Sequence, residues 1–167
     1  GIFRQRKCGM RRPFVETLSK LAEKDPRILF IIGDVGFSFC EPFIARFPKQ
    51  FKNVGASEAK MMGYAVGRAH MGGKPYVYTM SNFILARPFE FVRNDIGFGN
   101  ANVKLFGVKG SEAYKFLGMS HNLQEGEEEK LCSLIPNLNY YIPQTEEETV
   151  EIMLKEYERI GPAYMRI

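Results

Sequence analysis

The chain has 167 residues, enough for one domain of ordinary size with a single well-buried core. Its apolar fraction of 45% and charged fraction of 25% are typical of globular proteins, and no apolar run is long enough to span a bilayer. The net charge of +4 is spread along the chain, and no basic run is interleaved with aromatic residues. We therefore expect neither a nucleic acid nor a membrane as a partner.

The cysteines exclude two classes of protein. There are three, Cys8, Cys40 and Cys132, and none has the CxxC spacing of a metal site. An odd number without such spacing argues against a disulfide framework and against zinc. Free thiols in a reducing compartment are the simplest interpretation, so we expect a cytoplasmic protein without a signal peptide and without a metal site of its own.

In chain order, the first half alternates between helix and strand patterns. Apolar spacing predicts a helix over residues 14–22, and the continuous apolar run at 28–32 predicts a strand buried on both faces. A short helix at 41–46 and a short strand at 51–54 follow. The next helix begins at Glu58 and ends near His70, before a Gly-Gly pair.

The second half repeats this alternation. Strands are predicted at 75–79, 103–108, 140–142 and 163–167, and one long helix is predicted from 82 to 95 with Pro88 as a first-turn proline or kink. A helix rich in glutamate follows His121, and a capping box at 145–148 opens the last helix. Strand and helix alternate throughout, which predicts one α/β domain with a mostly parallel sheet.

Several polar or aromatic residues follow directly after predicted strands. They are Asp34, Glu58, Phe83, Lys109 and His121. Ligands of open α/β sheets bind beyond the carboxyl ends of the strands, so this placement groups the five residues at one edge. Each also has an ordinary interpretation: a helix-start charge for Glu58, a core ring for Phe83, and a turn or loop residue for Asp34 and His121.

The segment 53–63, with the pattern N-x-G-x-x-E-x-x-M-x-G, resembles the transketolase family. Further matches follow in the family's order, at residues 10–18, 31–38, 82–95, 102–121 and 161–166. The resemblance is to the pyrimidine-binding domain, whose fold has three layers with a mostly parallel central sheet between helices. It implies a domain over residues 10–167. Residues 1–9 do not fit the pattern and are expected to be a tag, a linker or an N-terminal arm.

The resemblance assigns a thiamine diphosphate cofactor and residues that bind it. Glu58 matches the glutamate that contacts the aminopyrimidine ring and starts the cofactor's activation, a role in acid–base catalysis. Phe83 matches the aromatic residue that stacks on that ring. Arg87 and Asp34 are also expected to bind the cofactor, with Asp34 near the thiazolium ring or the substrate. No diphosphate and Mg²⁺ motif is found in the chain, so the resemblance implies that a separate diphosphate-binding domain or subunit supplies it.

The resemblance also implies a phosphorylated small-molecule substrate. Arg11, Ser38 and Arg166 match positions that hold a sugar phosphate, and His121 matches a catalytic histidine near the reacting carbon. Two positions depart from the family: Lys109 stands where relatives have a substrate-contacting histidine, and Leu117 where sugar-specific members have aspartate. Lys109 is therefore expected to contact the substrate, while ordinary pentose-phosphate specificity is in doubt.

These observations imply one subunit of a transketolase-like transferase that moves a two-carbon ketol unit in carbohydrate metabolism. The isolated chain is expected to be inactive and to form a homo- or hetero-oligomer with a partner. Two alternatives remain open from the sequence. One is a subunit of a 2-ketoacid decarboxylase or of a deoxyxylulose-phosphate-synthase-like enzyme. The other is a non-catalytic regulatory or assembly domain that keeps the fold.

Overall fold

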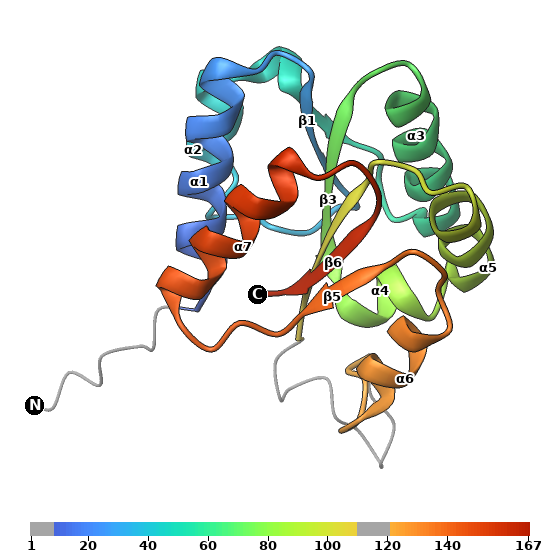
Figure 1. Ribbon diagram of the computed structural model, residues 1–167. Coiled ribbons are helices and arrows are strands. Elements are labelled where there is room, and N and C mark those ends of the chain that lie inside the picture. Colours follow the sequence, from blue (N-terminus) through green and yellow to red (C-terminus); the bar gives the residue numbers. More distant parts are fainter. Residues whose placement is uncertain (1–8, 110–120) are drawn as a thin grey trace, which may run out of the picture.

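The computed structural model describes residues 9–109 and 121–167, and within them a parallel sheet forms the centre of the molecule (Figure 1). The sheet has six strands in the order β2-β1-β3-β4-β6-β5, and every neighbouring pair is parallel. The strands are β1 (Ile28–Ile32), β2 (Phe51–Asn53), β3 (Lys74–Met80), β4 (Lys104–Val108), β5 (Asn139–Tyr141) and β6 (Ala163–Arg166). The expected strands are confirmed with boundary shifts of one residue.

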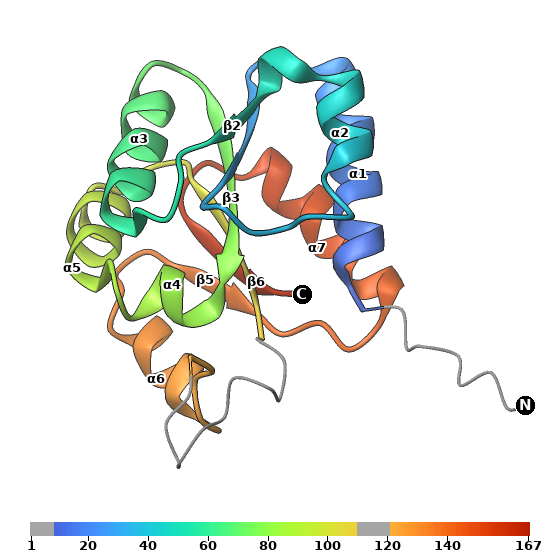
Figure 2. The same ribbon diagram turned by 180° about the vertical axis from the view of Figure 1, so that it is seen from behind.

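Helices cover both faces of this sheet, which gives the predicted three layers (Figures 1 and 2). One face carries α1, α2 and α7, and the other carries α3, α4, α5 and η2. Their bounds are α1 (Arg11–Lys24), α2 (Glu41–Arg46), η1 (Pro48–Gln50), α3 (Glu58–His70), α4 (Ser81–Leu85), α5 (Phe89–Phe91), η2 (Val92–Phe98), α6 (Glu127–Ser133) and α7 (Glu146–Glu158). The α/β fold class predicted from the sequence is confirmed.

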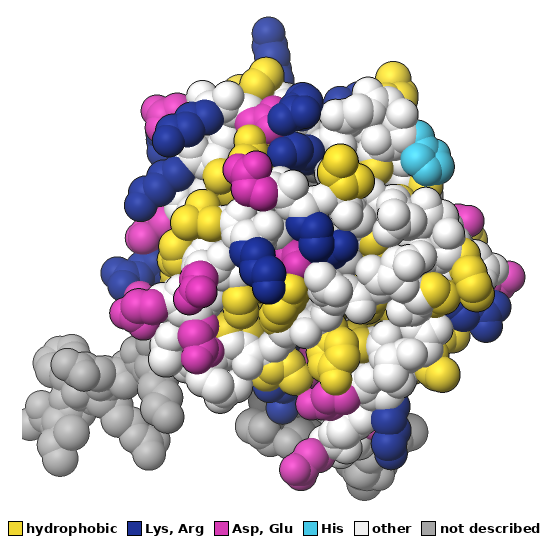
Figure 3. Space-filling model, viewed as in Figure 1, with side chains coloured by type: hydrophobic (Ala, Val, Ile, Leu, Met, Phe, Trp, Pro, Cys, Tyr) yellow, Lys and Arg dark blue, Asp and Glu magenta, His cyan; other side chains and the backbone are white. Residues whose placement is uncertain are grey.

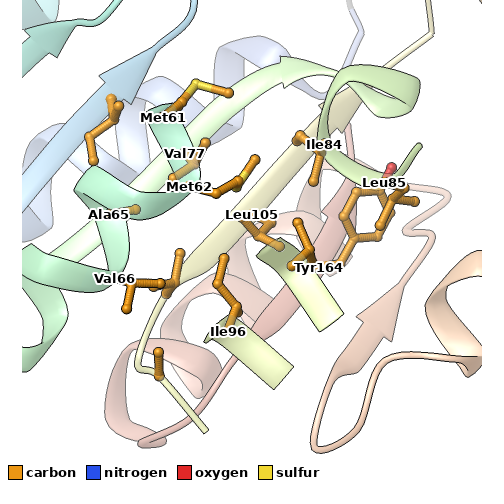
Figure 4. Packing of buried hydrophobic residues seen from close by; sticks show 14 of the residues in the cluster. Met61, Met62, Ala65, Val66, Val77, Ile84, Leu85, Ile96, Leu105 and Tyr164 are labelled. Atoms are coloured by element: carbon orange, nitrogen blue, oxygen red, sulfur yellow. The ribbon is translucent and has the colours of Figure 1, made fainter. Parts of the chain in front are cut away.

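Alternating side chains of the buried strands fill two separate cores. In β1, Phe30 and Ile32 pack toward α1 and α2, while Leu29 and Ile31 pack toward α3. Figure 4 shows how α3, α4 and η2 close over the second face. The side chains that meet there are Met61, Met62, Ala65, Val66, Val77, Ile84, Leu85, Ile96, Leu105 and Tyr164. Because both faces are covered, the central strands are apolar throughout, as the run at 28–32 predicted.

The predicted helix over residues 82–95 is interrupted, and the interruption lies at Pro88, the proline predicted to start or kink it. Helix α4 ends at Leu85, a turn follows, and α5 and the π-helical segment η2 resume after Pro88. Proline has no N–H and restricts the residue before it, so Arg87 leaves the helical path. The backbone N–H groups of Ala86 and Arg87 both donate to the Asn82 carbonyl, at 2.9 and 3.0 Å. The break brings the Arg87 side chain close to the start of α3.

The capping box at 145–148 is confirmed in a modified form. The Thr145 hydroxyl accepts a hydrogen bond from the Glu148 N–H at 3.1 Å. In return, the Glu148 carboxylate accepts a hydrogen bond from the N–H of Gln144 at 2.7 Å. Gln144 precedes the capping residue Thr145, whereas a standard capping box uses the N–H of the capping residue itself. Two backbone donors at the helix start are thus satisfied.

The strand order fixes where a ligand can bind. The chain passes from β1 to β2 on one side and then crosses to β3 on the other, so the direction reverses between β1 and β3. In open sheets such a reversal leaves a crevice at the carboxyl ends of the strands. The loops after β1 and β2 and helix α4 after β3 meet at this point, at the lower edge of the sheet in Figure 1.

The surface carries charges of both signs. Figure 3 shows basic and acidic side chains interspersed on one face, with apolar side chains exposed among them. The most exposed large apolar residues of the described chain include Met71, Ile160, Phe37 and Phe98. Among residues 9–109 and 121–167, none of the helices has the length and apolar character needed to cross a bilayer.

Candidate active site at the carboxyl edge of the sheet

A side chain from β2 organises the loops that lead to Glu58. The Asn53 side-chain oxygen accepts from the N–H of Asp34 at 3.0 Å and from the N–H of Gly55 at 2.9 Å. Its amide nitrogen donates to the Asp34 carboxylate at 3.3 Å. Gly55 has a φ of +78°, which residues with a side chain rarely adopt. Asn53 therefore ties the loop after β1 to the turn that starts α3.

Glu58 is the first residue of α3, and its carboxylate is paired across the crevice. The Arg87 Nη1 donates to Glu58 Oε1 at 3.2 Å, while the Glu58 side chain is only 15% exposed. The preceding residue, Ser57, makes no side-chain capping bond. Glu58 thus lies at the positive end of a helix with its carboxylate directed at a neighbour on another element, which a simple helix-start charge does not require.

Phe83 and Arg87 are stacked beside Glu58. The Arg87 guanidinium carbon lies 4.1 Å from the centroid of the Phe83 ring, within the range of a cation–π contact. His121 meets the same ring edge-on, with centroids 5.6 Å apart and an interplanar angle of 64°. Three residues predicted for cofactor binding and one predicted for catalysis therefore form one contiguous group: Glu58, Phe83, Arg87 and His121.

The chemistry of this group fits one half of thiamine diphosphate. A single guanidinium reaches both the Glu58 carboxylate and the Phe83 ring, so an acid and an aromatic face lie within the span of one small planar group. A 4-aminopyrimidine needs those two contacts: an acid for a ring nitrogen and an apolar surface for the ring face. Glu58 and Phe83 are thus the residues that would hold the pyrimidine.

The loop after β1 has an unusual backbone. Asp34 and Ser38 have φ values of +58° and +77°, in the left-handed region that non-glycine residues seldom occupy. Between them, Gly36 has a φ of +96°, and an added Cβ would lie 2.9 Å from the Cys40 Sγ. The Ser38 N–H donates to the Glu41 carboxylate at 2.8 Å. Such backbone strain is typical of loops that present groups to a ligand.

Lys109 and Arg166 lie together in a second part of the same edge. They line a hollow of about 320 Å³ with side chains that follow His121, including Leu123 and Glu128. Arg166 is not free there, because its Nη1 pairs with the Glu128 carboxylate at 3.2 Å. Lys109 is exposed. The hollow therefore offers an anionic group one exposed ammonium and the remaining donors of a partly used guanidinium, beside three carboxylates, those of Glu125, Glu128 and Glu129.

Glu128 is the functional candidate that the sequence did not reveal. It is buried, and it also accepts hydrogen bonds from the Ser81 hydroxyl at 3.3 Å and from the Tyr164 hydroxyl. Burial and the Glu128 charge raise the pKa of Tyr164 well above its usual value, so the phenol stays protonated. Four glutamates stand close together at the start of α6, and only the fold shows which one turns inward.

Arg11 and Ser38 come from two further elements. Arg11 begins α1, is exposed, and lies near Tyr78, whose pKa burial raises to about 12. Ser38 lies in the loop after β1. The expectation that Arg11, Ser38 and Arg166 hold one phosphate stays a prediction.

Comparison with known proteins agrees with the geometry. The family model described as the transketolase pyrimidine-binding domain matches residues 6–167, nearly the whole chain. This chain belongs to that family. Transketolases are thiamine diphosphate enzymes, so the family assignment and the chemistry of Glu58 and Phe83 point to the same cofactor. The predicted resemblance is confirmed.

Relatives of this transketolase domain include subunits of split enzymes. It is 30% identical, over 94% of its length, to one of the subunits of the apulose-4-phosphate transketolase of Phocaeicola vulgatus. It is 29% identical, over 95% of its length, to a putative transketolase C-terminal section of Methanocaldococcus jannaschii. In each case the chain spans about half the length of the relative.

Solved structures give the same result. A structure described as a split-gene transketolase, inactive beta4 tetramer, superposes with a TM-score of 0.81 at 30% identity. The match covers 94% of this transketolase domain and 50% of that chain. Transketolase from Campylobacter jejuni superposes equally well at 18% identity over 25% of its chain, which shows the shared fold.

The acidic, histidine and cysteine side chains of the described residues do not converge on one point. Within residues 9–109 and 121–167, there is no cluster of three or more histidine, cysteine, aspartate or glutamate side chains suited to a metal ion. Cys40 and Cys132 are buried free thiols, and burial raises the pKa of each to about 12. Cys8, Leu117 and the segment 110–120 lie outside the described residues.

Proposed function

We propose that this chain is the pyrimidine-binding half of a transketolase-like enzyme that transfers a two-carbon ketol unit between phosphorylated substrates. The observation that carries the proposal is the pairing of Glu58 and Phe83 at the β1–β3 reversal, within reach of one planar group. Bound thiamine diphosphate supplies a nucleophilic carbon, C2 of its thiazolium ring. The side chains of this domain and of its partner orient the cofactor, hold its proton and bind the substrate.

Glu58 is assigned the proton at the pyrimidine N1′ atom. A carboxylate that is mostly shielded from water and lies at a helix start can hold a proton on a ring nitrogen in a fixed direction. Phe83 fixes the ring plane by stacking. We assign His121, which is in edge contact with Phe83, to the substrate bound beside the cofactor. Asp34, in the loop after β1 and bonded to Asn53, is assigned to the cofactor or the substrate.

Lys109 and Arg166 are assigned the anionic end of the substrate. They line one hollow, and Glu128 holds Arg166 in place from below. We assign Arg11 and Ser38 to the same anionic group, as the family resemblance implies. A lysine in place of the family's histidine at residue 109 favours a substrate with a different charge or length from the usual pentose phosphates.

A partner chain is part of this proposal. The described residues offer no metal cluster, and the chain covers half of its split-enzyme relatives. We assign Mg²⁺ and the cofactor's diphosphate to a separate diphosphate-binding domain or subunit. The name of the similar solved structure, an inactive tetramer, supports an oligomer that needs a second component. The purified chain alone should therefore show no thiamine-dependent turnover with Mg²⁺ present.

Glu58→Gln tests the assignment. In the complex with the diphosphate-binding partner, we expect turnover and proton exchange at C2 to fall by about 10²–10⁴-fold, because glutamine cannot serve as the acid. The free energy of unfolding should change by at most about 1 kcal/mol.

The matched control is Glu147→Gln, which changes an exposed first-turn glutamate of α7. It should leave exchange and turnover unchanged. Near-normal exchange at C2 in Glu58→Gln would show that Glu58 has only a helix-start role, and would favour a non-catalytic domain that retains the fold.

A further inference from the structure

Arg87 contacts both Glu58 and Phe83. Its guanidinium donates to Glu58 at 3.2 Å and stacks over Phe83 at 4.1 Å. These are the two contacts that the proposed function assigns to the cofactor's ring. One side chain of the protein therefore engages both groups in the free chain.

The chemical likeness between the two occupants explains the fit. A guanidinium is planar and carries N–H donors around a central carbon, and it stacks readily on aromatic rings. A 4-aminopyrimidine protonated at its N1′ atom is also planar and cationic, and it presents one N–H at that atom. Both groups can donate an N–H to a carboxylate while laying a flat face on a ring. The site is thus complementary to planar cationic N–H donors, a class to which arginine belongs.

The exposure of Arg87 and its place in a turn allow its side chain to move away from Glu58 and Phe83. The side chain is 50% exposed, whereas Glu58 is 15% exposed, so the guanidinium covers the carboxylate from the solvent side. Arg87 lies in the turn between α4 and α5, where Pro88 has interrupted the helix. An exposed arginine on a turn exchanges between rotamers quickly and at low energetic cost.

We propose that Arg87 is an internal placeholder for the cofactor's pyrimidine ring, and that binding of the ring requires its displacement. In the free chain it gives the Glu58 carboxylate a partner and covers the Phe83 face. This proposal rests on the proposed function, and it replaces the expectation that Arg87 itself binds the cofactor. It predicts competition between Arg87 and the pyrimidine for the same two groups.

The test uses the pyrimidine half of thiamine, 4-amino-5-hydroxymethyl-2-methylpyrimidine, as a probe with the full chain. Binding is measured by NMR titration for the wild type, Arg87→Ala, Glu58→Gln and a control. We expect Arg87→Ala to bind the probe about 5-fold more tightly, the scale on which a half-exposed ion pair competes. Weaker binding of the probe by Arg87→Ala would overturn the proposal and show that Arg87 contacts the ring directly. Equal binding would overturn it too, and would show that Arg87 does not affect binding.

Arg93→Ala is the matched control. Arg93 lies on the same segment over another ring, Phe89, at 5.7 Å, and its side chain donates to Asn94 rather than to Glu58. It should leave the affinity for the probe unchanged. A tightening equal to that of Arg87→Ala would mean that net charge, and not displacement, is responsible, and would overturn the proposal.

Glu58→Gln separates this inference from the proposed function. In the Arg87→Ala background, Glu58→Gln should weaken probe binding at least about 10-fold if the ring lies on Glu58. Tight binding that survives this change would contradict the proposed function itself. If the probe binds too weakly to measure in every variant, the NMR signal of the ¹⁵N-labelled Arg87 Nε is compared between the wild type and Glu58→Gln. This signal should shift in Glu58→Gln if Arg87 is paired with Glu58. An unchanged signal would overturn the proposal that Arg87 is a placeholder.

Discussion

Charged side chains at the two edges of the parallel sheet differ in their burial and in the number of their partners. At the amino edge, Asp25 accepts from Arg27 at 2.7 and 2.8 Å and from the Tyr157 hydroxyl at 2.9 Å. Lys74 lies 3.7 Å from the same carboxylate. At the carboxyl edge, Asp34 is bonded to the Asn53 amide, and Glu58 is paired with a half-exposed arginine.

The same contrast exists within a single strand. Lys104 begins β4, is buried, and donates to the Gly161 and Arg159 carbonyls at 2.6 and 3.0 Å and to Glu156 at 3.3 Å. Lys109 follows the end of β4 and is exposed.

Among the described residues, Asp25 and Lys104 at the amino edge are buried and bonded to several partners, whereas Asp34 and Lys109 at the carboxyl edge are exposed. Glu128, which pairs with Arg166, is the buried exception at the carboxyl edge. Buried, fully bonded charges stabilise the fold, and exposed ones are available to a ligand.

The largest expected effect on stability comes from a comparison of Lys104, the first residue of β4, with Lys109, which follows the last. Lys104→Met should lower the free energy of unfolding by about 3 kcal/mol, because the Gly161 and Arg159 carbonyls lose their donor and the buried Glu156 carboxylate keeps only Arg159 as a cationic partner. Lys109→Met should change it by less than about 0.5 kcal/mol. Urea unfolding of both variants measures the difference. Equal losses would break the comparison between the edges.

The two aspartates give a second matched pair. Asp25→Asn should lower the free energy of unfolding by roughly 2–3 kcal/mol, since the charge of a buried acceptor with several donors is removed. Asp34→Asn should cost less than about 1 kcal/mol, because asparagine tolerates the left-handed backbone and keeps a bond to Asn53. The reverse order of losses by urea unfolding would show that Asp34, not Asp25, stabilises the fold.

The pH dependence of stability gives a further test of the role of Asp25 at the amino edge. Hydrogen bonds from Arg27 hold the pKa of Asp25 well below its ordinary value of 3.8. Asp25 therefore contributes stability that is complete above that value and is lost as the pH falls toward the folded-state pKa. The stability gap between wild type and Asp25→Asn should be constant above about pH 5 and narrow below it. Urea titrations at several pH values measure this gap, and one that widens with acid would contradict the assignment.

The smallest expected effect is a gain. Ser38 has a φ of +77° at the carboxyl edge, where glycine would carry no steric penalty. Ser38→Gly should raise the free energy of unfolding by about 0.5–1 kcal/mol. Thermal melts of the chain alone measure it. A loss of stability would mean that the serine is held by contacts that outweigh its backbone strain.

Sequence patterns predicted the fold well because they report on burial. The run at 28–32 could only be a strand covered on both faces, and the helix of Glu58 was bounded by a turn and a Gly-Gly pair. Within residues 82–95, apolar spacing continues across Pro88, while the helical backbone is interrupted there. A single proline decided where Arg87 points, which periodicity cannot show.

The candidate site was predicted in part. Glu58, Phe83 and His121 were grouped by position and are in contact through Phe83 and Arg87. Glu128 was missed, because a run of acids at a helix start gives no sign of which one is buried. The pairing of Arg87 with Glu58 was also unpredicted, since both side chains are charged surface types whose meeting depends on the turn between α4 and α5.

Gly107 has a consequence for anyone who redesigns this pocket. An added Cβ at that position in β4 would overlap the Tyr164 hydroxyl and lie 2.7 Å from the Ser81 Oγ. The glycine, the phenol, the serine and the Glu128 carboxylate therefore form one interlocked unit, in which a change at one position requires changes at the others. Libraries aimed at new substrates should leave that unit intact and diversify Lys109, which is exposed to solvent.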